Sequence, residues 1–541
     1  MWGAAWGAAW GEAWGEAWVA TQRLPESGTW AITWPMRIAM FALLGAATLT
    51  AFTAPLAQDH SPSALPPYEA QSEAARQIER IRTLDDGPQG INAVIIYSQT
   101  AAFKARALAN TGTLKGRTVL VKDNIETSEW ATTAGSLALQ SNFTRRDAPL
   151  IANLRRAGGA VLGKANLSEW ANIRSSDSTS GWSAVGGLTR NPHAIDRNTC
   201  GSSSGSGAGV AAGFAWGAIG TETNGSITCP ASINGIVGFK PSVGIVSRTH
   251  VVPISSTQDT AGPMTRNVTD AAMLLSAIAG EDEADPATLE AQRIADYADG
   301  LEDYSLQGVR IGVMMNQRGN RADLRAIFAK ARADLEAAGA VMIEIEHEPN
   351  RQMFSDSYTV LKYELREEMG KYLRSIPAIK GGTTPRSLAD LIAFNKANEA
   401  REMRWFGQDI FIEAEATTDR EAYEKARADA VRIAGKETLD ALMAKHNVRF
   451  LIAPTRGPSW VSDLVNGDSF NGSIGFGAPP AIAGYPHLTV PMGAIEGLPV
   501  GLSIIGAKWA DHDVLKAGRA YEKARTATLP EPSFKRWSPQ D

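Results

Sequence analysis

The chain has 541 residues, of which 44% are apolar and 21% charged, and its 53 basic and 58 acidic residues give a formal net charge of −5. This composition is typical of a globular protein and excludes general disorder. A mildly acidic chain lacks the basic surface that nucleic-acid binding requires, so we expect no nucleic-acid partner. Two cysteines exclude a disulfide-dense scaffold, and seven scattered histidines without HExxH spacing argue against a metal centre.

The first 57 residues differ from the rest of the chain. Tryptophan recurs every four residues in WGAA and WGEA units, at Trp2, Trp6, Trp10, Trp14 and Trp18. Such a stripe is compatible with an interfacial membrane helix. We favour the alternative that a short repeat lies upstream of the true start of the protein.

A second pattern begins at Met36. Arg37 is followed by an uncharged stretch, 38–54, and by small residues near Ala54 and Ala57. A basic start, an apolar stretch and small residues at the cut are typical of a cleaved secretory signal, although an uncleaved anchor is the alternative. We therefore expect a leader over 1–57 with a signal peptide over 36–57, and a flexible tether over 58–67. The protein would be exported, periplasmic or secreted, without stable membrane association after cleavage.

From residue 68 onward, helical and strand patterns alternate. A polar helix is expected over 73–85, and longer helices over 323–339 and 420–446. Short apolar runs predict strands over 92–98, 118–123, 160–165, 309–315, 341–346, 449–454, 488–493 and 500–506. This alternation indicates an α/β protein with a large covered sheet. We expect one domain over 68–541, with a helical excursion at about 318–447 that covers one side.

A Gly/Ser-rich segment over 197–248 carries the strongest functional signal. It lacks the GK[ST] ending of a phosphate-binding loop. A flexible linker is disfavoured because the run continues into GVAAGFAWGAIG (209–220), which predicts an interior helix of small residues. The pattern GSSSG places Ser203 as in a nucleophile elbow. No strong strand precedes it, and the late His487 and His512 lie in no supporting motif.

Serine chemistry without histidine requires another base, and Lys122 is a candidate. It ends the apolar run TVLVK, in which strand alternation places Thr118, Leu120 and Lys122 on one face. Burial disfavours the ammonium form of lysine, so a buried lysine can accept a serine proton. A lysine in a surface turn after a strand is the alternative.

Several longer motifs resemble those of the amidase-signature hydrolases. GRTVLVKDNIET, CGSSSGSGAGVAAG and IGTETNGSITCPASINGIVGFKPS occur in the order that the family uses. VLGKANLSEWAN, QDTAGPMTRNVTDAA, AGYPHLTVPMG and LPVGLSIIG extend the resemblance over roughly 70–525. SGWSAVGGLTRNP, RSLADLIAFN and FGQDIFIEAEAT look most like bacterial peptide amidases, which remove the amide from peptide C-termini. The resemblance implies one large domain with a mixed central sheet covered by helices on both sides.

The resemblance also implies the catalytic groups. Ser226 would be the nucleophile, Ser202 the bridging serine and Lys122 the base, and no cofactor or metal would be needed. The peptide bond between Gly201 and Ser202 would be cis. The oxyanion hole would consist of backbone N–H groups in the TETNGS turn, at Thr223, Asn224 and Gly225. Asn224 departs from the Asp or Gly that relatives often carry.

Neighbouring residues receive structural roles. Ser203 and Ser206 would only satisfy local hydrogen bonds, and Lys164 in LGKANLSEW would belong to a structural motif. For Cys200 and Cys229 we expect two small buried thiols, with a disulfide as the alternative.

The expected activity is hydrolysis of carboxamides to a carboxylic acid and ammonia through an acyl-enzyme. The substrate would be a peptide C-terminal amide or, alternatively, a small-molecule amide. Two other classes of function are the alternatives. The protein would be a subunit of a tRNA-dependent amidotransferase, or a catalytically inactive relative that only binds substrate. Specificity would arise from the excursion at 318–447 and the loop over 456–482, which carries Trp460, Phe470 and Phe476.

Overall fold

The computed structural model describes residues 67–539. The predicted tryptophan repeat, the signal peptide and almost all of the tether lie outside the described residues. Within 67–539, no helix is both long enough and apolar enough to cross a membrane.

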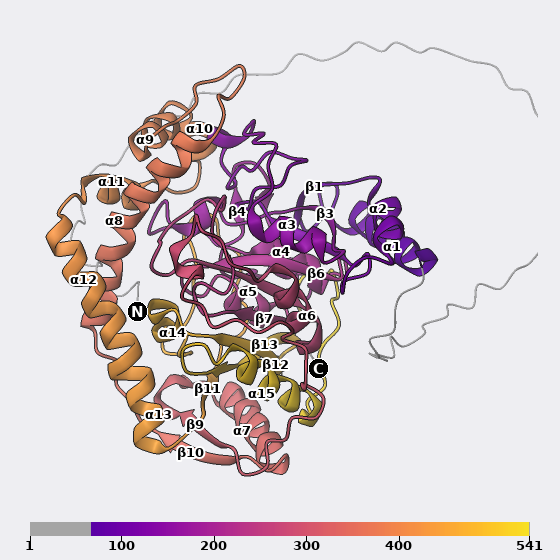
Figure 1. Cartoon of the computed structure of the whole chain (residues 1–541), viewed down its shortest axis with the longest axis vertical. Coiled ribbons are helices and arrows are strands. Elements are labelled where there is room, and N and C mark those ends of the chain that lie inside the picture. Colours follow the sequence, from indigo (N-terminus) through magenta and orange to yellow (C-terminus); the bar gives the residue numbers. More distant parts are fainter. Residues whose placement is uncertain (1–66, 540–541) are drawn as a thin grey trace, which may run out of the picture. The chain divides into compact units, whose positions relative to one another are not determined.

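The centre of the described part is an eleven-stranded mixed sheet (Figure 1). Its strands follow the spatial order β1-β3-β2-β6-β8-β7-β12-β13-β11-β9-β10. β2 pairs in parallel with β3 and β6, β9 pairs in parallel with β10 and β11, and the other pairs are antiparallel. The bounds are β1 (Val94–Tyr97), β2 (Thr118–Lys122), β3 (Ala160–Ala165), β6 (Gly217–Glu222), β7 (Val237–Lys240), β8 (Thr260–Thr265), β9 (Arg310–Met314), β10 (Val341–Ile345), β11 (Phe450–Pro454), β12 (His487–Ile495) and β13 (Leu498–Ile505). β4 (Trp182–Ser183) and β5 (Gly187–Leu188) form a separate two-stranded sheet.

Helices connect the strands and cover the sheet. Their bounds are α1 (Pro67–Leu84), α2 (Ala101–Leu108), α3 (Pro149–Arg156), α4 (Ser204–Ala211), α5 (Thr228–Ile233), α6 (Val268–Ile278), α7 (Ala322–Ala337), α8 (Gln352–Ser375), α9 (Leu388–Ala397), α10 (Glu399–Glu402), α11 (Asp409–Ala416), α12 (Arg420–Arg432), α13 (Ala441–His446), α14 (Ala478–Ala483) and α15 (Asp511–Ala524). A π-helical segment, Ile433–Asp440, joins α12 to α13.

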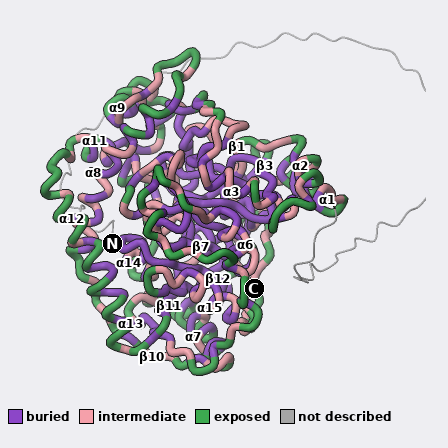
Figure 2. Tube along the Cα trace, viewed as in Figure 1, coloured by how far each residue is buried: buried purple, intermediate pink, exposed green. Residues whose placement is uncertain are grey.

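Strand β2 shows how the two faces of the sheet are buried. Val119 and Val121 pack into a core that includes side chains of α3, α6, α7 and α15. Leu120, which points to the other face, packs with α1, α4 and α5. The alternation therefore divides one buried strand between two cores, and the central strands are buried throughout (Figure 2). The expected α/β fold with a mixed sheet covered on both sides is confirmed.

The middle of the chain is mostly helical. α8 and α12 lie side by side at one margin of the molecule (Figure 1). α12 buries only Ala426 and Ala430, so most of its surface is exposed (Figure 2). The segment 318–447 also contains α7 and β10, and β10 extends the sheet beside β9.

The prediction of one helix over 209–220 was wrong. α4 ends at Ala211, and β6 begins at Gly217 between β2 and β8. Gly213 adopts a φ of 72°, a left-handed conformation that ends the helix and that glycine adopts without strain. Small residues fit the close packing of either element, so composition alone did not separate them.

Candidate active site

Lys122 ends β2 in the interior of the protein. Its side chain is fully buried, and its Nζ lies 2.7 Å from Ser202 Oγ, 2.7 Å from Thr221 Oγ1 and 3.3 Å from the Thr221 carbonyl oxygen. Burial lowers the pKa of Lys122 to about 7, although the negative charges of Asp259 and Glu222 act in the opposite direction. The amine is therefore placed and tuned to exchange a proton with Ser202 near neutral pH.

The segments that carry Ser202 and Ser226 are joined by two hydrogen bonds from backbone N–H groups. Ser202 N–H donates to Ser226 Oγ over 3.2 Å, and Ser203 N–H donates to the Ser226 carbonyl oxygen over 3.2 Å. Ser202 is buried just before α4, and Ser226 precedes α5 by two residues. The structure thus brings together Lys122, Ser202 and Ser226, which are separated by up to 104 positions in the chain.

The expected cis peptide bond between Gly201 and Ser202 is not present. No peptide bond is cis within residues 67–539. The chain turns here through two consecutive left-handed residues, Cys200 with a φ of 56° and Gly201 with a φ of 58°. This turn presents the N–H of Ser202, rather than its hydroxyl, to Ser226 Oγ.

The expected oxyanion turn holds free backbone donors. The N–H groups of Thr223, Asn224 and Gly225 donate to no acceptor among the described residues. Gly225 has a φ of 88°, and a Cβ at this position would meet one non-adjacent atom within 4 Å, Nη2 of Arg456 at 3.8 Å. The side chain of Asn224 is exposed. The turn therefore offers donors beside open space, as oxyanion stabilisation requires.

Residues that the sequence did not indicate hold this turn in place. Thr223 Oγ1 donates to Asp259 Oδ1 over 2.6 Å, and Gln258 Nε2 donates to the Thr223 carbonyl oxygen over 3.2 Å. Ser357 on α8 in turn donates to Gln258 Oε1 over 2.7 Å. The motif QDTAGP contains Gln258 and Asp259, but nothing in the sequence pairs them with residue 223 or with α8.

Glu222 organises the start of α5. Its Oε2 accepts hydrogen bonds from the N–H groups of Ile227 and Thr228 over 2.8 and 3.0 Å. A carboxylate at the N-terminus of a helix is favourable because the first N–H groups lack intrahelical acceptors. The segment that carries Ser226 is thereby fixed between β6 and α5.

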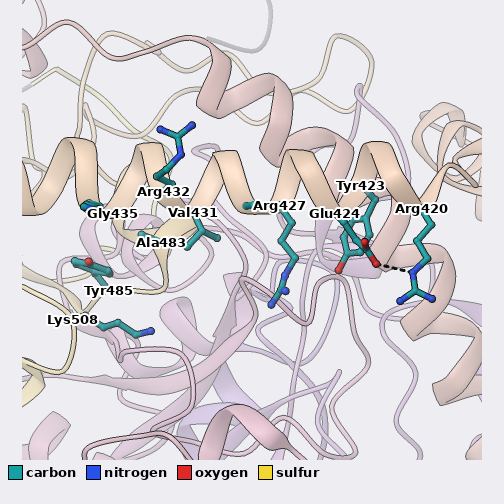
Figure 3. A pocket seen from close by; sticks show the side chains of 12 residues that line it. Arg420, Tyr423, Glu424, Arg427, Val431, Arg432, Gly435, Ala483, Tyr485 and Lys508 are labelled. Atoms are coloured by element: carbon teal, nitrogen blue, oxygen red, sulfur yellow. Dashed lines mark hydrogen bonds and ion pairs between the residues drawn. The ribbon is translucent and has the colours of Figure 1, made fainter.

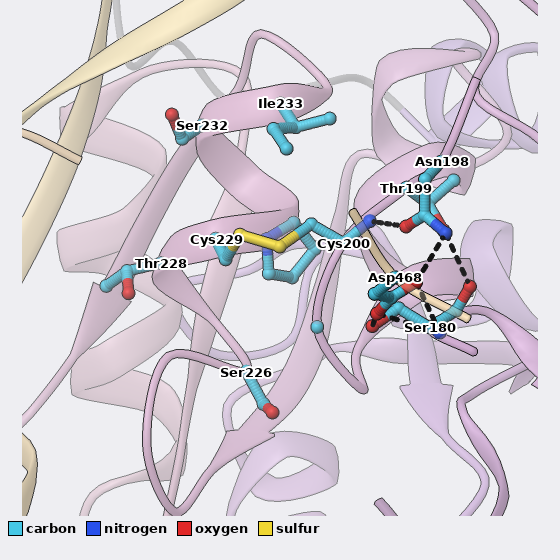
Figure 4. The surroundings of a disulfide bond; sticks show 12 residues. Ser180, Asn198, Thr199, Cys200, Ser226, Thr228, Cys229, Ser232, Ile233 and Asp468 are labelled. Carbon is cyan, nitrogen blue, oxygen red and sulfur yellow. Dashed lines mark hydrogen bonds between the residues drawn. A yellow bond between two sulfur atoms is a disulfide. The ribbon is translucent and has the colours of Figure 1, made fainter. Parts of the chain in front are cut away.

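Cys200 and Cys229 form a disulfide, so the expectation of two free thiols was wrong. Their Cα atoms are 5.7 Å apart, and both residues are buried beside Ile233 and Trp460. The bond links the turn before Ser202 to α5 just after Ser226 (Figure 4). Sequence could not establish it because the 29-residue separation says nothing about distance in space.

The alternative nucleophile Ser203 has no histidine partner among residues 67–539. Its Oγ donates to the Thr221 carbonyl oxygen and accepts from the Thr221 N–H, over 3.0 and 3.1 Å. His487 Nε2 instead lies 2.6 Å from Ser503 Oγ, and His512 Nε2 lies 2.7 Å from the Asp299 carbonyl oxygen. The geometry therefore does not support a nucleophile elbow.

Two other residues form the local contacts that the sequence indicated. Ser206 Oγ donates to the Ile219 carbonyl oxygen over 3.2 Å. Lys164, fully buried, forms an ion pair with Asp123 at 3.1 Å and donates to the Ile125 carbonyl oxygen over 2.5 Å. Within residues 67–539, no cluster of three or more His, Cys, Asp or Glu side chains could hold a metal ion.

A groove of about 650 Å³ lies along α12 (Figure 3). Its lining residues are Arg420, Tyr423, Glu424, Arg427, Ala428, Val431, Arg432, Gly435, Lys436, Ala483, Tyr485 and Lys508. Lys122, Ser202 and Ser226 are not among them, so this groove is not the candidate active site.

Comparison with known proteins defines the class. A model of the Amidase family matches residues 77–515. A crystal structure of native peptide amidase from Stenotrophomonas maltophilia superposes with a TM-score of 0.80 and 44% identity, covering 86% of this chain and 95% of that chain. An Arabidopsis thaliana protein described as a probable amidase is 35% identical over 447 residues, 80% of this chain and 81% of its own. A glutamyl-tRNA(Gln) amidotransferase subunit of Symbiobacterium thermophilum is 34% identical over 423 residues, 76% of this chain and 83% of its own.

The chain belongs to the amidase family. It is a hydrolytic amidase, structurally close to peptide amidase.

Proposed function

We propose that this amidase removes the amide from peptide C-termini through a relay of Ser226, Ser202 and Lys122. The observation that carries the proposal is the buried Lys122 amine at 2.7 Å from Ser202 Oγ, with Ser226 Oγ against the N–H of the same serine. A pKa of about 7 keeps much of Lys122 neutral under mild conditions. A neutral amine can act as the base that a serine nucleophile requires.

The first half of the reaction forms an acyl-enzyme. Neutral Lys122 accepts the Ser202 hydroxyl proton, and Ser202 accepts the proton of Ser226 as Ser226 Oγ attacks the amide carbonyl carbon. For this transfer, Ser226 Oγ moves from the N–H of Ser202 to its hydroxyl, and such contacts commonly tighten when substrate binds. The N–H groups of Thr223, Asn224 and Gly225 stabilise the resulting oxyanion.

The second half releases the products. Ser202 transfers a proton to the departing nitrogen, the C–N bond breaks, and ammonia leaves. Water then attacks the acyl-enzyme, losing its proton to the same relay, and the carboxylic acid and free Ser226 form. Every proton is exchanged between the substrate, water and these three side chains.

Peptide amides are the proposed substrate because of the neighbouring structures and the walls of the site. The structural neighbour from Stenotrophomonas maltophilia is named a peptide amidase. The loop over 456–482 contributes a partly buried Trp460 whose ring centroid lies 5.9 Å from that of Phe470. Such aromatic walls suit a peptide side chain.

The test measures ammonia release by the full chain from peptide amides, the corresponding free-acid peptides and simple amides. Ser226→Ala and Lys122→Met should each abolish release from peptide amides. Ser206→Ala is the matched control, because it removes a hydroxyl from the same Gly/Ser segment and should retain activity. Release that persists in Ser226→Ala would reject the relay. Release from simple amides alone would reject peptide amides as the substrate, and the chain would still be an amidase.

The amidotransferase relative supports a second candidate, a component that delivers ammonia within a complex. Free ammonia from the isolated chain at a rate unaffected by added tRNA and bacterial lysate would reject it. Activity that appears only with those additions would favour it.

We further propose that the protein is exported and that residues 36–57 direct this export. The disulfide supports an oxidising compartment, because such bonds are rare where glutathione keeps thiols reduced. Fractionation of expressing bacterial cells and N-terminal sequencing test the proposal. A chain that stays in the cytosol with its first 57 residues intact would contradict it.

A further inference from the structure

An arginine borders the open space above the proposed oxyanion turn. Arg456 follows β11 by two residues, and its Nη2 lies 3.8 Å from the position that a Cβ would take on Gly225. No other non-adjacent atom lies within 4 Å of that position. A substrate held by Ser226 and this turn would therefore have the guanidinium as a near neighbour.

The N–H donors of the Arg456 guanidinium have no acceptor among residues 67–539. Arg456 forms no hydrogen bond or ion pair with any of the residues 67–539. Its Cζ atom lies 5.2 Å from the centroid of the Phe470 ring. Burial lowers the pKa of Arg456 while Glu222 raises it. Arginine nevertheless remains charged in proteins. Five N–H donors in a partly buried position beside a reaction centre point to a ligand oxygen.

The position of Arg456 is set by its neighbours. Thr455 N–H donates to the Gly501 carbonyl oxygen over 2.7 Å on one side. On the other side, Asn198 N–H donates to the Trp460 carbonyl oxygen over 2.8 Å. These bonds fix the main chain on both sides of Arg456, and the ring of Phe470 lies beside the guanidinium.

The charges around Arg456 select the kind of oxygen. Glu222 acts on Arg456 and on Lys122 alike. A substrate carboxylate beside Arg456 would add a further negative charge to those of Asp259 and Glu222, raise the pKa of Lys122 and reduce the share of neutral base. A neutral carbonyl group at the same place would leave the pKa of Lys122 unchanged. A free α-ammonium group at the same place would be repelled by Arg456.

We infer that Arg456 determines specificity by donating hydrogen bonds to a carbonyl oxygen of the substrate's acyl part, in the peptide unit that precedes the scissile amide. The inference rests on the proposed function and names the group that the site recognises. It makes the enzyme prefer N-acylated and peptide amides over simple amides, and both over amides of free amino acids.

Four amides that share a benzyl group test this inference with the full chain. N-acetylphenylalanine amide carries the carbonyl, 3-phenylpropanamide lacks it, phenylalanine amide carries an ammonium, and benzylmalonic acid monoamide carries a carboxylate. Ammonia release gives kcat and KM for the wild type, Arg456→Met and Arg456→Lys. Arg145→Met is the matched control, since exposed Arg145 stacks on Phe143 at the same 5.2 Å.

Arg456→Met should lower kcat/KM for N-acetylphenylalanine amide by about 10- to 100-fold, the range of a hydrogen bond to a charged group. The value for 3-phenylpropanamide should change less than about threefold, and that for phenylalanine amide should rise. Arg456→Lys should recover part of the loss, and Arg145→Met should match the wild type.

Two results would overturn the inference while leaving the amidase intact. Equal losses on all four amides would show a structural role, and a wild-type preference for the carboxylate compound that Arg456→Met abolishes would show an acid-binding site. A wild type that releases no ammonia from any of the four would instead reject the proposed function itself.

Discussion

Two buried lysines in neighbouring strands show how their surroundings assign different roles. Lys122 on β2 and Lys164 on β3 are both fully buried, and burial lowers the pKa of each. Lys164 has Asp123 at 3.1 Å, and this carboxylate favours the charged amine. Lys122 has hydroxyl and carbonyl partners and no ion pair within 67–539. The proposed base is therefore the lysine that lacks a carboxylate in contact.

The pH dependence of activity follows from Lys122. Since the proposed relay needs the neutral amine, kcat/KM should rise about tenfold per pH unit below the pKa of about 7 and level off above it. Rates of ammonia release between pH 5 and 9 measure this profile, with far-UV circular dichroism as a check on folding. A profile that rises only near pH 10 would contradict a lowered pKa of Lys122.

Replacing Lys122 by Met should abolish activity and stabilise the fold. The folded pKa is below the ordinary 10.5, so the unfolded chain binds more protons between about pH 7 and 10.5. The wild type therefore gains stability as pH rises through this window. Urea unfolding should show that the advantage of Lys122→Met shrinks by about 2 kcal/mol from pH 7 to pH 9. An advantage that does not change with pH would contradict the linkage.

At the scale of elements, the sequence predicted strands where apolar runs are strong and missed them where they are weak. The runs over 118–123 and 160–165 became β2 and β3. β6, β7 and β8 were not predicted, because GAIGTE, VGFK and TAGPMT contain glycine, proline or polar residues that weaken the strand signal. These strands are formed by pairing with distant partners, which no local pattern contains.

The disulfide should support both stability and catalysis. It joins two residues 29 positions apart, and the loop between them contains Ser202 and Ser226. A disulfide across a loop of this length stabilises the folded state by about 3–4 kcal/mol in the chain-entropy description. Cys200→Ser with Cys229→Ser should lower the unfolding free energy by this order and reduce kcat. Dithiothreitol under mild denaturation should reproduce the effect in the wild type and leave the double variant unchanged. Equal sensitivity of both proteins would contradict this role.

The helical middle should influence catalysis through Gln258. This side chain joins Ser357 on α8 to the carbonyl of Thr223 in the proposed oxyanion turn. Gln258→Leu removes both hydrogen bonds, so kcat should fall about tenfold with little change in KM, because the turn acts on the transition state. Ser355→Ala removes an exposed hydroxyl of α8 as the matched control. A change confined to KM would place Gln258 in substrate binding instead.

At the scale of the whole molecule, the alternation of strands and helices predicted a covered sheet but not its order. The sequence brought Lys122, Ser202 and Ser226 to attention through family resemblance, and each lies in the candidate site. The contacts from Asp259, Gln258 and Arg456 depend on which strands become neighbours. Strand order follows from long-range pairing, such as that of β6 with β8, and is therefore not encoded within any one segment.

Because the two cores share strands, the described part should unfold as one unit. Leu120 of β2 and Ile219 of β6 are both fully buried but belong to cores on opposite faces of the sheet. Leu120→Ala and Ile219→Ala should each lower the stability by about 2–5 kcal/mol, and each should shift a single thermal transition. Val465→Ala is the control, since Val465 is 77% exposed. Far-UV dichroism and tryptophan fluorescence should give coincident curves for every variant, because a cavity on either face weakens strands that both faces require. Separate transitions would show that the two faces are independent.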